Sequence, residues 1–306
     1  MDGRPSSEEG TTTMENECNA SGENESLLEH FRSSFDYERS ASFGTPSGNY
    51  FWYRKRREVL RVLRRNIDEL RSSDSTSASP ALLLELGCGS GTDLYLIHDL
   101  LKPTGPWRFM GLDASPNAIA QARLKQRHYG AGVEFLQADL TEKLPIADGT
   151  VQVVYCSEVV EHLPFPEQLL AEIHRVLRPG GYLLLTTPNE PNVFQRSFWS
   201  NARRRRLEAE TRKQEAPSVT VGGKNVFLRG HISLRTIGEW DSSLRASGFS
   251  LVDFGRGSSS YGGGGVWDTE WALSAKFLLE GVLDVFPGRW VRTLSDELIA
   301  LYRRSP

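Results

Sequence analysis

The sequence predicts an α/β fold with a doubly wound, mostly parallel, seven-stranded sheet and helices on both faces. Three observations support this prediction. Short apolar segments alternate with helical patterns from residue 81 onward, as in parallel sheets covered on both sides. A glycine-rich turn, 87–91, links the first strand to the first helix. The chain has 306 residues, 39% of them hydrophobic, which suffices for one large domain with appendages.

Before the sheet, the sequence predicts a tail and a helical cap. Residues 1–30 are rich in Ser, Glu, Asn and Gly, so we expect a disordered acidic tail. A helical cap and linker are expected over 31–80, with a basic run at 54–57 and a polar linker at its end. An amphipathic helix is predicted where apolar residues recur at helical spacing, namely Val59, Leu60, Val62, Leu63, Ile67 and Leu70.

The core is predicted over 81–255, with an insertion at 190–232 that interrupts the alternation. Helices are expected to open near Gly91 and at Pro116, where Ser115 supplies a cap before a proline. Residues 256–306 are predicted to add a C-terminal helix and a closing strand. The seven expected strands are 82–86, 108–112, 133–137, 151–156, 182–187, 249–254 and 298–302.

Composition narrows the class of protein. The net charge of −3 gives the whole molecule no electrostatic reason to bind nucleic acid. Cys18, Cys88 and Cys156 have neither metal-ligand nor disulfide spacing, as is usual in a reducing compartment. No secretory signal pattern is present, and no apolar run approaches the ~18 residues of a membrane span. We therefore expect a cytoplasmic protein without a transmembrane segment.

Glycines at alternate positions mark the end of the first strand. Gly87, Gly89 and Gly91 suit a backbone that turns with positive φ or lies flush against a ligand. Doubly wound sheets bind ligands at such strand-to-helix turns, at the carboxyl ends of their strands. Thr92 stands where the dinucleotide fingerprint places its third glycine, which disfavours NAD.

Two acidic residues end the next two strands. Asp113 lies about 20 residues after the glycine turn, where a carboxylate can accept both hydroxyls of a ribose. Asp139 repeats the pattern after the third strand and is placed to meet an adenine amino group. The alternative for Asp139 is a helix cap or turn residue.

In their order, these motifs resemble those of the S-adenosylmethionine-dependent methyltransferases with a Rossmann-like fold, and of their type 11 group. The motifs are the segment 85–91, Asp113, Asp139 and the turn 177–181. The resemblance implies S-adenosylmethionine as the cofactor, a loop positioned by Glu85, a ribose held by Asp113 and an adenine contact from Asp139. The residues predicted to bind the cofactor are Glu85, Gly87, Cys88, Gly89, Gly91, Asp113, Ala114, Asp139, Leu140 and Ser157.

Two carboxylates and an imidazole follow the fourth strand, in the segment 157–163. If this segment is helical, Glu158, Glu161 and His162 share one face. His162 is then a candidate general base, because the ordinary pKa of imidazole lies near neutrality. In a non-functional interpretation, His162 packs under the cofactor and the glutamates are solvated.

A metal site is the other functional interpretation of these three residues. The pattern Glu-x-x-Glu-His is similar to that of ubiquinone-type O-methyltransferases and small-RNA 2′-O-methyltransferases, in which it implies a metal. Glu158, Glu161 and His162 would hold Mg²⁺ or Zn²⁺, which lowers the pKa of an acceptor hydroxyl. His231 is the candidate for a further ligand or catalytic residue.

Segments added to the core are expected to select the acceptor. Aromatic residues at 50–53 either wall an apolar pocket or pack helices onto the sheet. The basic runs 54–57 and 203–206 suit a phosphate, nucleotide-linked sugar, RNA or anionic lipid, or form solvated faces. The helix 268–286 has acidic residues opposite its apolar ones, which favours a core element or pocket lid over a membrane-surface helix.

The expected function is methyl transfer from S-adenosylmethionine to a small-molecule or glycan-like acceptor by in-line displacement. A hydroxyl oxygen is the favoured atom because of the acidic-histidine segment. The alternatives are an RNA 2′-O-methyltransferase and a non-catalytic cofactor-binding scaffold.

Overall fold

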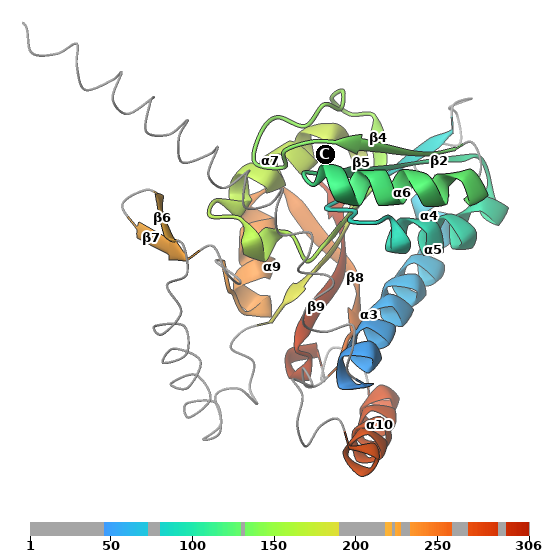
Figure 1. Cartoon of the computed structure of the whole chain (residues 1–306), viewed down its shortest axis with the longest axis vertical. Helices are drawn as coiled ribbons and strands as arrows, with labels where there is room; N and C mark the ends of the chain where they lie inside the picture. Colours follow the sequence, from blue (N-terminus) through green and yellow to red (C-terminus); the bar gives the residue numbers. More distant parts are fainter. Residues whose placement is uncertain are drawn as a thin grey trace, which may run out of the picture.

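The structure is a computed structural model that describes residues 46–72, 80–129, 132–189, 218–221, 224–227, 233–258, 269–286 and 292–305. The predicted acidic tail and the basic run 203–206 lie outside the described residues. Seven strands form one sheet with helices on both faces, so the predicted fold class is confirmed (Figure 1). In the part of the chain that is described, no helix combines the length and apolar character that crossing a membrane requires.

The sheet has the order β3-β2-β1-β4-β5-β9-β8. Only β9 is antiparallel to its neighbours, β5 and β8. Strands β1 to β3 are added toward one edge of the sheet and β4 and β5 toward the other, so the order of strands switches between the parallel neighbours β1 and β4. Doubly wound sheets bind ligands at such switch points. The strands are β1 (Ala81–Leu86), β2 (Trp107–Asp113), β3 (Val133–Gln137), β4 (Val151–Ser157), β5 (Leu177–Pro188), β8 (Phe249–Arg256) and β9 (Glu297–Arg304).

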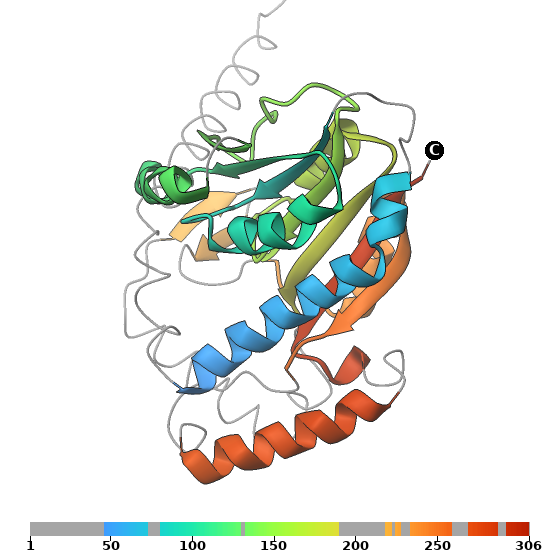
Figure 2. The same ribbon diagram turned by 90° about the vertical axis from the view of Figure 1, so that its right-hand side faces the viewer.

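Helices cover each face of the sheet with a separate apolar layer. α7 (Pro166–Val176) and α9 (Ile237–Ala246) pack on one face, where Trp240 is fully buried. The other layer holds α3 (Pro46–Arg65), α4 (Ile67–Ser72), α5 (Thr92–Leu101) and α6 (Pro116–Tyr129) (Figure 2). The predicted start of α6 is confirmed, because the Ser115 hydroxyl accepts from the N–H of Ala118 at 3.2 Å.

The predicted N-terminal helix differs from the observed one in two ways. Helix α3 begins at Pro46, so the basic run belongs to it. The helix is interrupted by a turn at Asn66, before α4 begins. The Asn66 amide donates to the Val62 carbonyl at 2.8 Å and to Asp253 of β8 at 2.7 Å. These side-chain bonds compete with the helical pattern and tie the break to the sheet. A further difference is a hairpin inside the predicted insertion, formed by β6 (Ser218–Val221) and β7 (Lys224–Phe227).

Helix α10 (Glu270–Val285) turns its charged residues inward. Lys276 and Glu280 are buried, whereas Trp271 is 68% exposed and Val285 is 84% exposed. Of the two roles expected for this helix, that of a core element is therefore wrong for its apolar side, and that of a pocket lid stays a prediction. Arg54 of α3, expected on a solvated face or against a phosphate, is 3% exposed and donates to both oxygens of Asp284, at 2.8 and 2.9 Å. Ion pairs fix the orientation of α10 because Arg256 of β8 also binds Glu280 and Asp284.

We expect Asp284→Asn to lower the free energy of unfolding by about 1.5–3 kcal/mol at pH 7, the range for hydrogen bonds to charged groups. Burial raises the pKa of Asp284, but the hydrogen bonds from Arg54 and Arg256 outweigh it and hold the pKa well below its ordinary value. A carboxyl with a depressed folded-state pKa stabilises the fold above its unfolded pKa of about 4, and this contribution is lost as the pH falls further. Urea unfolding at pH 7 and below pH 4 should show the difference from wild type shrinking in acid.

The control for this variant is Asp148→Asn. Asp148 also pairs with an arginine, Arg175, at 2.5 Å, but its side chain is 75% exposed. Exposed ion pairs contribute about 0–1 kcal/mol. Equal effects of the two substitutions at pH 7 would contradict the role assigned to the buried network.

Candidate active site

The glycine turn after β1 has the backbone conformation that requires glycine. The φ angles of Gly87, Gly89 and Gly91 are 70°, 51° and 75°. A Cβ at Gly87 would lie 2.4 Å from the Val159 side chain, and one at Gly91 would lie 2.7 Å from the Phe135 ring. The turn is therefore packed tightly against residues that follow β4 and lie in β3.

Hydrogen bonds join this turn to the carboxyl ends of β2 and β3. The N–H of Gly89 donates to the Asp113 carboxylate at 2.8 Å, and the N–H of Ser115 donates to its other oxygen at 2.8 Å. The N–H of Ala138, next to Asp139, donates to the Asp113 carbonyl at 3.0 Å. Burial raises the pKa of the Asp113 carboxyl, and the two N–H donors partly offset that rise. The three predicted binding segments thus lie together at one edge of the sheet.

Asp139 also forms a turn of its own. Its Oδ1 accepts from the N–H of Thr141 at 2.8 Å and from the Thr141 hydroxyl at 2.7 Å. Asp139 is therefore a turn residue, as the alternative interpretation expected, and its contact with adenine stays a prediction. Leu140 is buried beside it.

The other predicted cofactor residues lie at the same edge. Glu85 and Cys88 are buried on either side of the start of the glycine turn. The Ala114 carbonyl accepts from the Gln137 amide at 3.1 Å, and the Ser157 hydroxyl lies 2.9 Å from that of Thr186. The neighbouring ends of β1, β2 and β4 carry these residues.

The acidic-histidine segment is not helical, so the expected shared face of Glu158, Glu161 and His162 is wrong. Glu158 has a φ of 53°, and Val160–His162 forms a single 3₁₀ turn. A glutamate at positive φ costs of order 1 kcal/mol or more and persists only where its surroundings hold it. The N–H of Glu158 donates to the Thr186 carbonyl at 3.0 Å, and its Oε1 accepts from the Thr186 hydroxyl at 3.1 Å.

A buried lysine from α3 reaches this segment. Lys55 is 1% exposed, and its Nζ lies 3.6 Å from Glu158 and 3.8 Å from Glu297 of β9. Burial raises the pKa of Glu297, and Lys55 partly counteracts the rise. Sequence analysis missed Lys55 because it stands among arginines in a run that resembles a solvated face.

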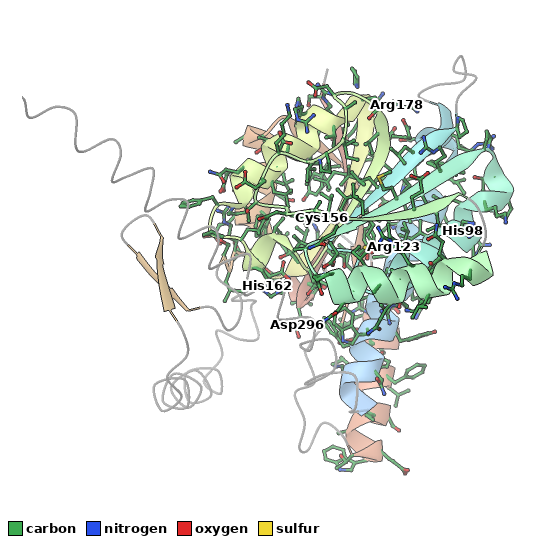
Figure 3. All side chains as sticks on the ribbon, turned by 45° about the horizontal axis from the view of Figure 1, so that its top comes forward. His98, Arg123, Cys156, His162, Arg178 and Asp296 are labelled. Atoms are coloured by element: carbon green, nitrogen blue, oxygen red, sulfur yellow. The ribbon has the colours of Figure 1, made fainter. Side chains whose placement is uncertain are left out.

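Glu161 and His162 occupy different environments. Glu161 is buried and accepts from the Thr187 hydroxyl at 3.0 Å, and burial followed by the charge of Glu158 raises its pKa. His162 is partly exposed, with Nε2 at 3.8 Å from a Glu161 oxygen. Figure 3 shows Cys156 within the sheet and His162 beyond the end of β4.

The metal interpretation does not fit the residues that are described. Among them, no group of three or more His, Cys, Asp or Glu side chains is placed to hold a metal ion. Glu158 and Glu161 are instead occupied by Thr186 and Thr187. His231, the predicted further ligand or catalytic residue, lies outside the described residues.

Residues 84–185 match a protein family described as a methyltransferase domain. The chain is 38% identical over 107 residues to a probable S-adenosylmethionine-dependent methyltransferase of Mycolicibacterium smegmatis, covering 35% of this chain and 38% of that protein. It is 31% identical over 107 residues to the ubiquinone biosynthesis O-methyltransferase of Pseudomonas aeruginosa, covering 35% of this chain and 44% of the relative. The chain thus spans less than half the length of these two relatives.

A solved structure shares the fold. It is the 1,6-didemethyltoxoflavin-N1-methyltransferase of Burkholderia thailandensis with bound 1,6-didemethyltoxoflavin and S-adenosylhomocysteine. The TM-score is 0.51 at 15% identity, and the alignment covers 100% of this chain and 94% of that one. At this identity the likeness concerns the fold alone.

Proposed function

We propose that this chain, whose residues 84–185 match a methyltransferase domain, transfers a methyl group from S-adenosylmethionine to a hydroxyl oxygen of a small-molecule or glycan-like acceptor. The observation that carries the proposal is the 2.8 Å bond from Gly89 to Asp113, which joins the glycine turn to the acidic end of β2. A carboxylate held there can accept from ribose hydroxyls, and the glycines beside it let a ligand approach the backbone closely.

When bound, S-adenosylmethionine supplies an activated methyl group on its sulfonium, so the protein must chiefly align an acceptor for in-line displacement and exclude water. Alignment alone lowers such barriers by ~7–11 kcal/mol in well-ordered systems. The turn after β4 lies beside the glycine turn, since Val159 would contact any side chain at Gly87. Glu158 and His162 of this turn are partly accessible, which suits them to bind a hydroxylated acceptor.

His162 is the residue proposed to remove the acceptor proton. It is the partly exposed imidazole at this edge, and the hydroxyl oxygen that attacks the methyl carbon must give up one proton, which passes to the ring. The turn is held by the His162 N–H, which donates to the Val159 carbonyl at 3.0 Å. No step through a metal ion is part of this proposal.

We expect His162→Gln to lower kcat by about 10²–10⁴-fold, the usual contribution of a general base, while cofactor affinity measured by calorimetry stays unchanged. The matched control is His174→Gln, because His174 lies on α7 against Phe249 of β8, with ring centroids 5.6 Å apart. EDTA should leave the wild-type rate unaffected. Loss of rate with EDTA and recovery with Mg²⁺ or Zn²⁺ would overturn the metal-free assignment.

Transfer of radiolabelled methyl from S-adenosylmethionine into fractionated cell extract tests the function itself. The wild-type chain should label a small, phenol- or glycan-like fraction, and Asp113→Ala should label none. Cofactor binding without any labelled product would support a scaffold role. A labelled RNA fraction, with affinity that falls steeply as salt rises, would replace the small acceptor with RNA.

A further inference from the structure

A basic groove of about 630 Å³ lies between α3 and α5. Two carboxylates face its cations: Asp93 lies 2.6 Å from Arg56, and Glu58 lies 3.0 Å from Arg61 and 4.0 Å from Arg57. Across the described ranges of the chain, Arg64 has no ion pair. The groove therefore keeps an excess of positive charge. Its four arginines are Arg56, Arg57, Arg61 and Arg64.

Apolar side chains separate these arginines. Leu60 of α3 and Leu96 and Leu100 of α5 line the same groove, together with Trp52 and Tyr53. Leu96 is 39% exposed and Tyr53 is 59% exposed. An occupant that matches this surface has carboxylates or other anions and a few apolar side chains close together in sequence.

The chain itself contains a segment of that chemistry. Residues 1–45 immediately precede α3, and residues 1–31 contain eight Asp or Glu side chains and a single arginine. Leu27, Leu28 and Phe31 lie among these acidic residues. The acidic tail has no part in the proposed function, and neither do Arg61 and Arg64 of α3.

We propose that the acidic tail segment 23–31 docks in the groove, with its carboxylates against Arg57, Arg61 and Arg64 and its apolar side chains against Leu96 and Leu100. The segment can reach the groove, because a random-coil linker of about 15 residues would span ~20–25 Å on average, and the groove follows α3 over about 15 residues at 1.5 Å each. An occupant from the same chain acts at an effective concentration of order mM. The three ion pairs and the apolar contacts with Leu96 and Leu100 then act together at a concentration where weak contacts are enough, whereas a free partner would need stronger ones.

The negative charge of the tail also favours the tail over external polyanions as the occupant of the groove. A bound tail removes the positive excess of the groove, so an external polyanion such as RNA or an anionic membrane gains little by binding there. Arg56 links the groove to the start of α5, because it donates to Asp93 at 2.6 Å and Asp93 lies two residues after Gly91 of the glycine turn.

Cys18 provides a native probe of the tail. The other two cysteines, Cys88 and Cys156, are buried free thiols, so a nitroxide reagent should label Cys18 alone in the full-length protein. The nitroxide should broaden the methyl NMR signals of Leu96 and Leu100. It should leave those of Leu169, on α7 at the opposite face of the sheet, unchanged. A Cys18→Ser sample treated in the same way shows whether labelling was selective.

Two sets of substitutions in the full chain test the contacts. Arg57→Gln with Arg61→Gln and Arg64→Gln should abolish the broadening, as should Glu23→Gln with Glu25→Gln and Glu29→Gln, or about 0.5 M salt. The matched control removes three exposed arginines elsewhere, Arg108, Arg127 and Arg245, and should leave the broadening intact.

Three results would overturn the proposal. The first is that the nitroxide does not broaden the Leu96 and Leu100 methyl signals, or broadens them as strongly in the two charge variants as in the wild type. The second is broadening seen only between nitroxide-labelled and isotope-labelled copies in a mixture, which would assign the groove to a second copy. The third is displacement of the Leu96 and Leu100 signals by single-stranded RNA or anionic vesicles with no effect of the tail substitutions, which would assign it to an external polyanion.

Discussion

Replacing Asp113 with alanine should weaken binding of S-adenosylmethionine by about 10²–10⁴-fold. The carboxylate is held at the end of β2 by the N–H groups of Gly89 and Ser115, and it is the group proposed to accept the ribose hydroxyls. Two hydrogen bonds to a charged group contribute about 1.5–3 kcal/mol each, which corresponds to the lower and upper limits of that range. Isothermal titration calorimetry with S-adenosylmethionine and S-adenosylhomocysteine measures the change.

The variant Asp113→Asn separates the two roles of this side chain. It keeps an oxygen that can accept from one N–H group, but it removes the negative charge, so its affinity should fall between those of wild type and Asp113→Ala. Asp148→Ala, an exposed carboxylate on the loop before β4, should bind the cofactor normally. Wild-type affinity in Asp113→Ala would remove the basis of the proposed cofactor site.

Gly87→Ala should lower the free energy of unfolding by about 2–6 kcal/mol and abolish cofactor binding. The φ of 70° strains any residue with a Cβ by about 1–3 kcal/mol. The new methyl group would lie 2.4 Å from the Val159 side chain, and such overpacking costs a further 1–3 kcal/mol or so. Val159 begins the turn that holds His162, so relief of the clash displaces the proposed base. Denaturant unfolding and calorimetry measure the two effects.

Alanine substitutions at two other glycines distinguish the cost of backbone strain at Gly87 from the cost of crowding by Val159. Gly149 has a similar φ of 64° but open space around its missing Cβ, so Gly149→Ala should cost only about 1–2 kcal/mol. Gly238 lies in α9 with open space and no positive φ, so Gly238→Ala should stabilise the protein by up to about 1 kcal/mol. Adding Val159→Ala to Gly87→Ala should recover only the part of the unfolding free energy that was lost to crowding. Equal losses for Gly87→Ala and Gly149→Ala would contradict the close packing.

The sheet could be predicted from sequence because each strand is a short apolar run between turn signals. All seven expected segments are strands of the sheet, and the approach of Asp113 to the glycine turn follows from the parallel order of β1 and β2. Parallel neighbours bring their carboxyl ends to one edge, so order along the chain is sufficient to place these residues together.

The contacts of the charged residues could not be predicted in the same way. A basic run such as 54–57 resembles a solvated face unless the partners of each residue are known. Here Arg54 pairs with Asp284 and Lys55 with Glu297, both more than 200 residues away along the chain. Helix α10 reverses the usual orientation for the same reason, because buried arginines attract its acidic side. Local periodicity contains no information on such long-range pairs.

The left-handed conformation of Glu158 likewise could not be predicted from the residue pattern. A Glu-x-x-Glu-His segment has good helical propensity. The Glu158 N–H, however, donates to the Thr186 carbonyl and the Glu158 carboxylate accepts from the Thr186 hydroxyl, and these two bonds select another conformation. Tertiary context overrides propensity here, as is common where side chains meet a ligand.

The position of β9 sets the order of events during biosynthesis. This strand is made after all the others of its sheet, yet it lies between β5 and β8 and pairs with both. Until residues 297–304 leave the ribosome, β5 lacks a partner on one side and β8 lacks a partner in this sheet. Open edges of this kind invite pairing with other nascent chains. Full pairing of the sheet is therefore reached only when the last of its strands in the sequence enters between two strands made earlier.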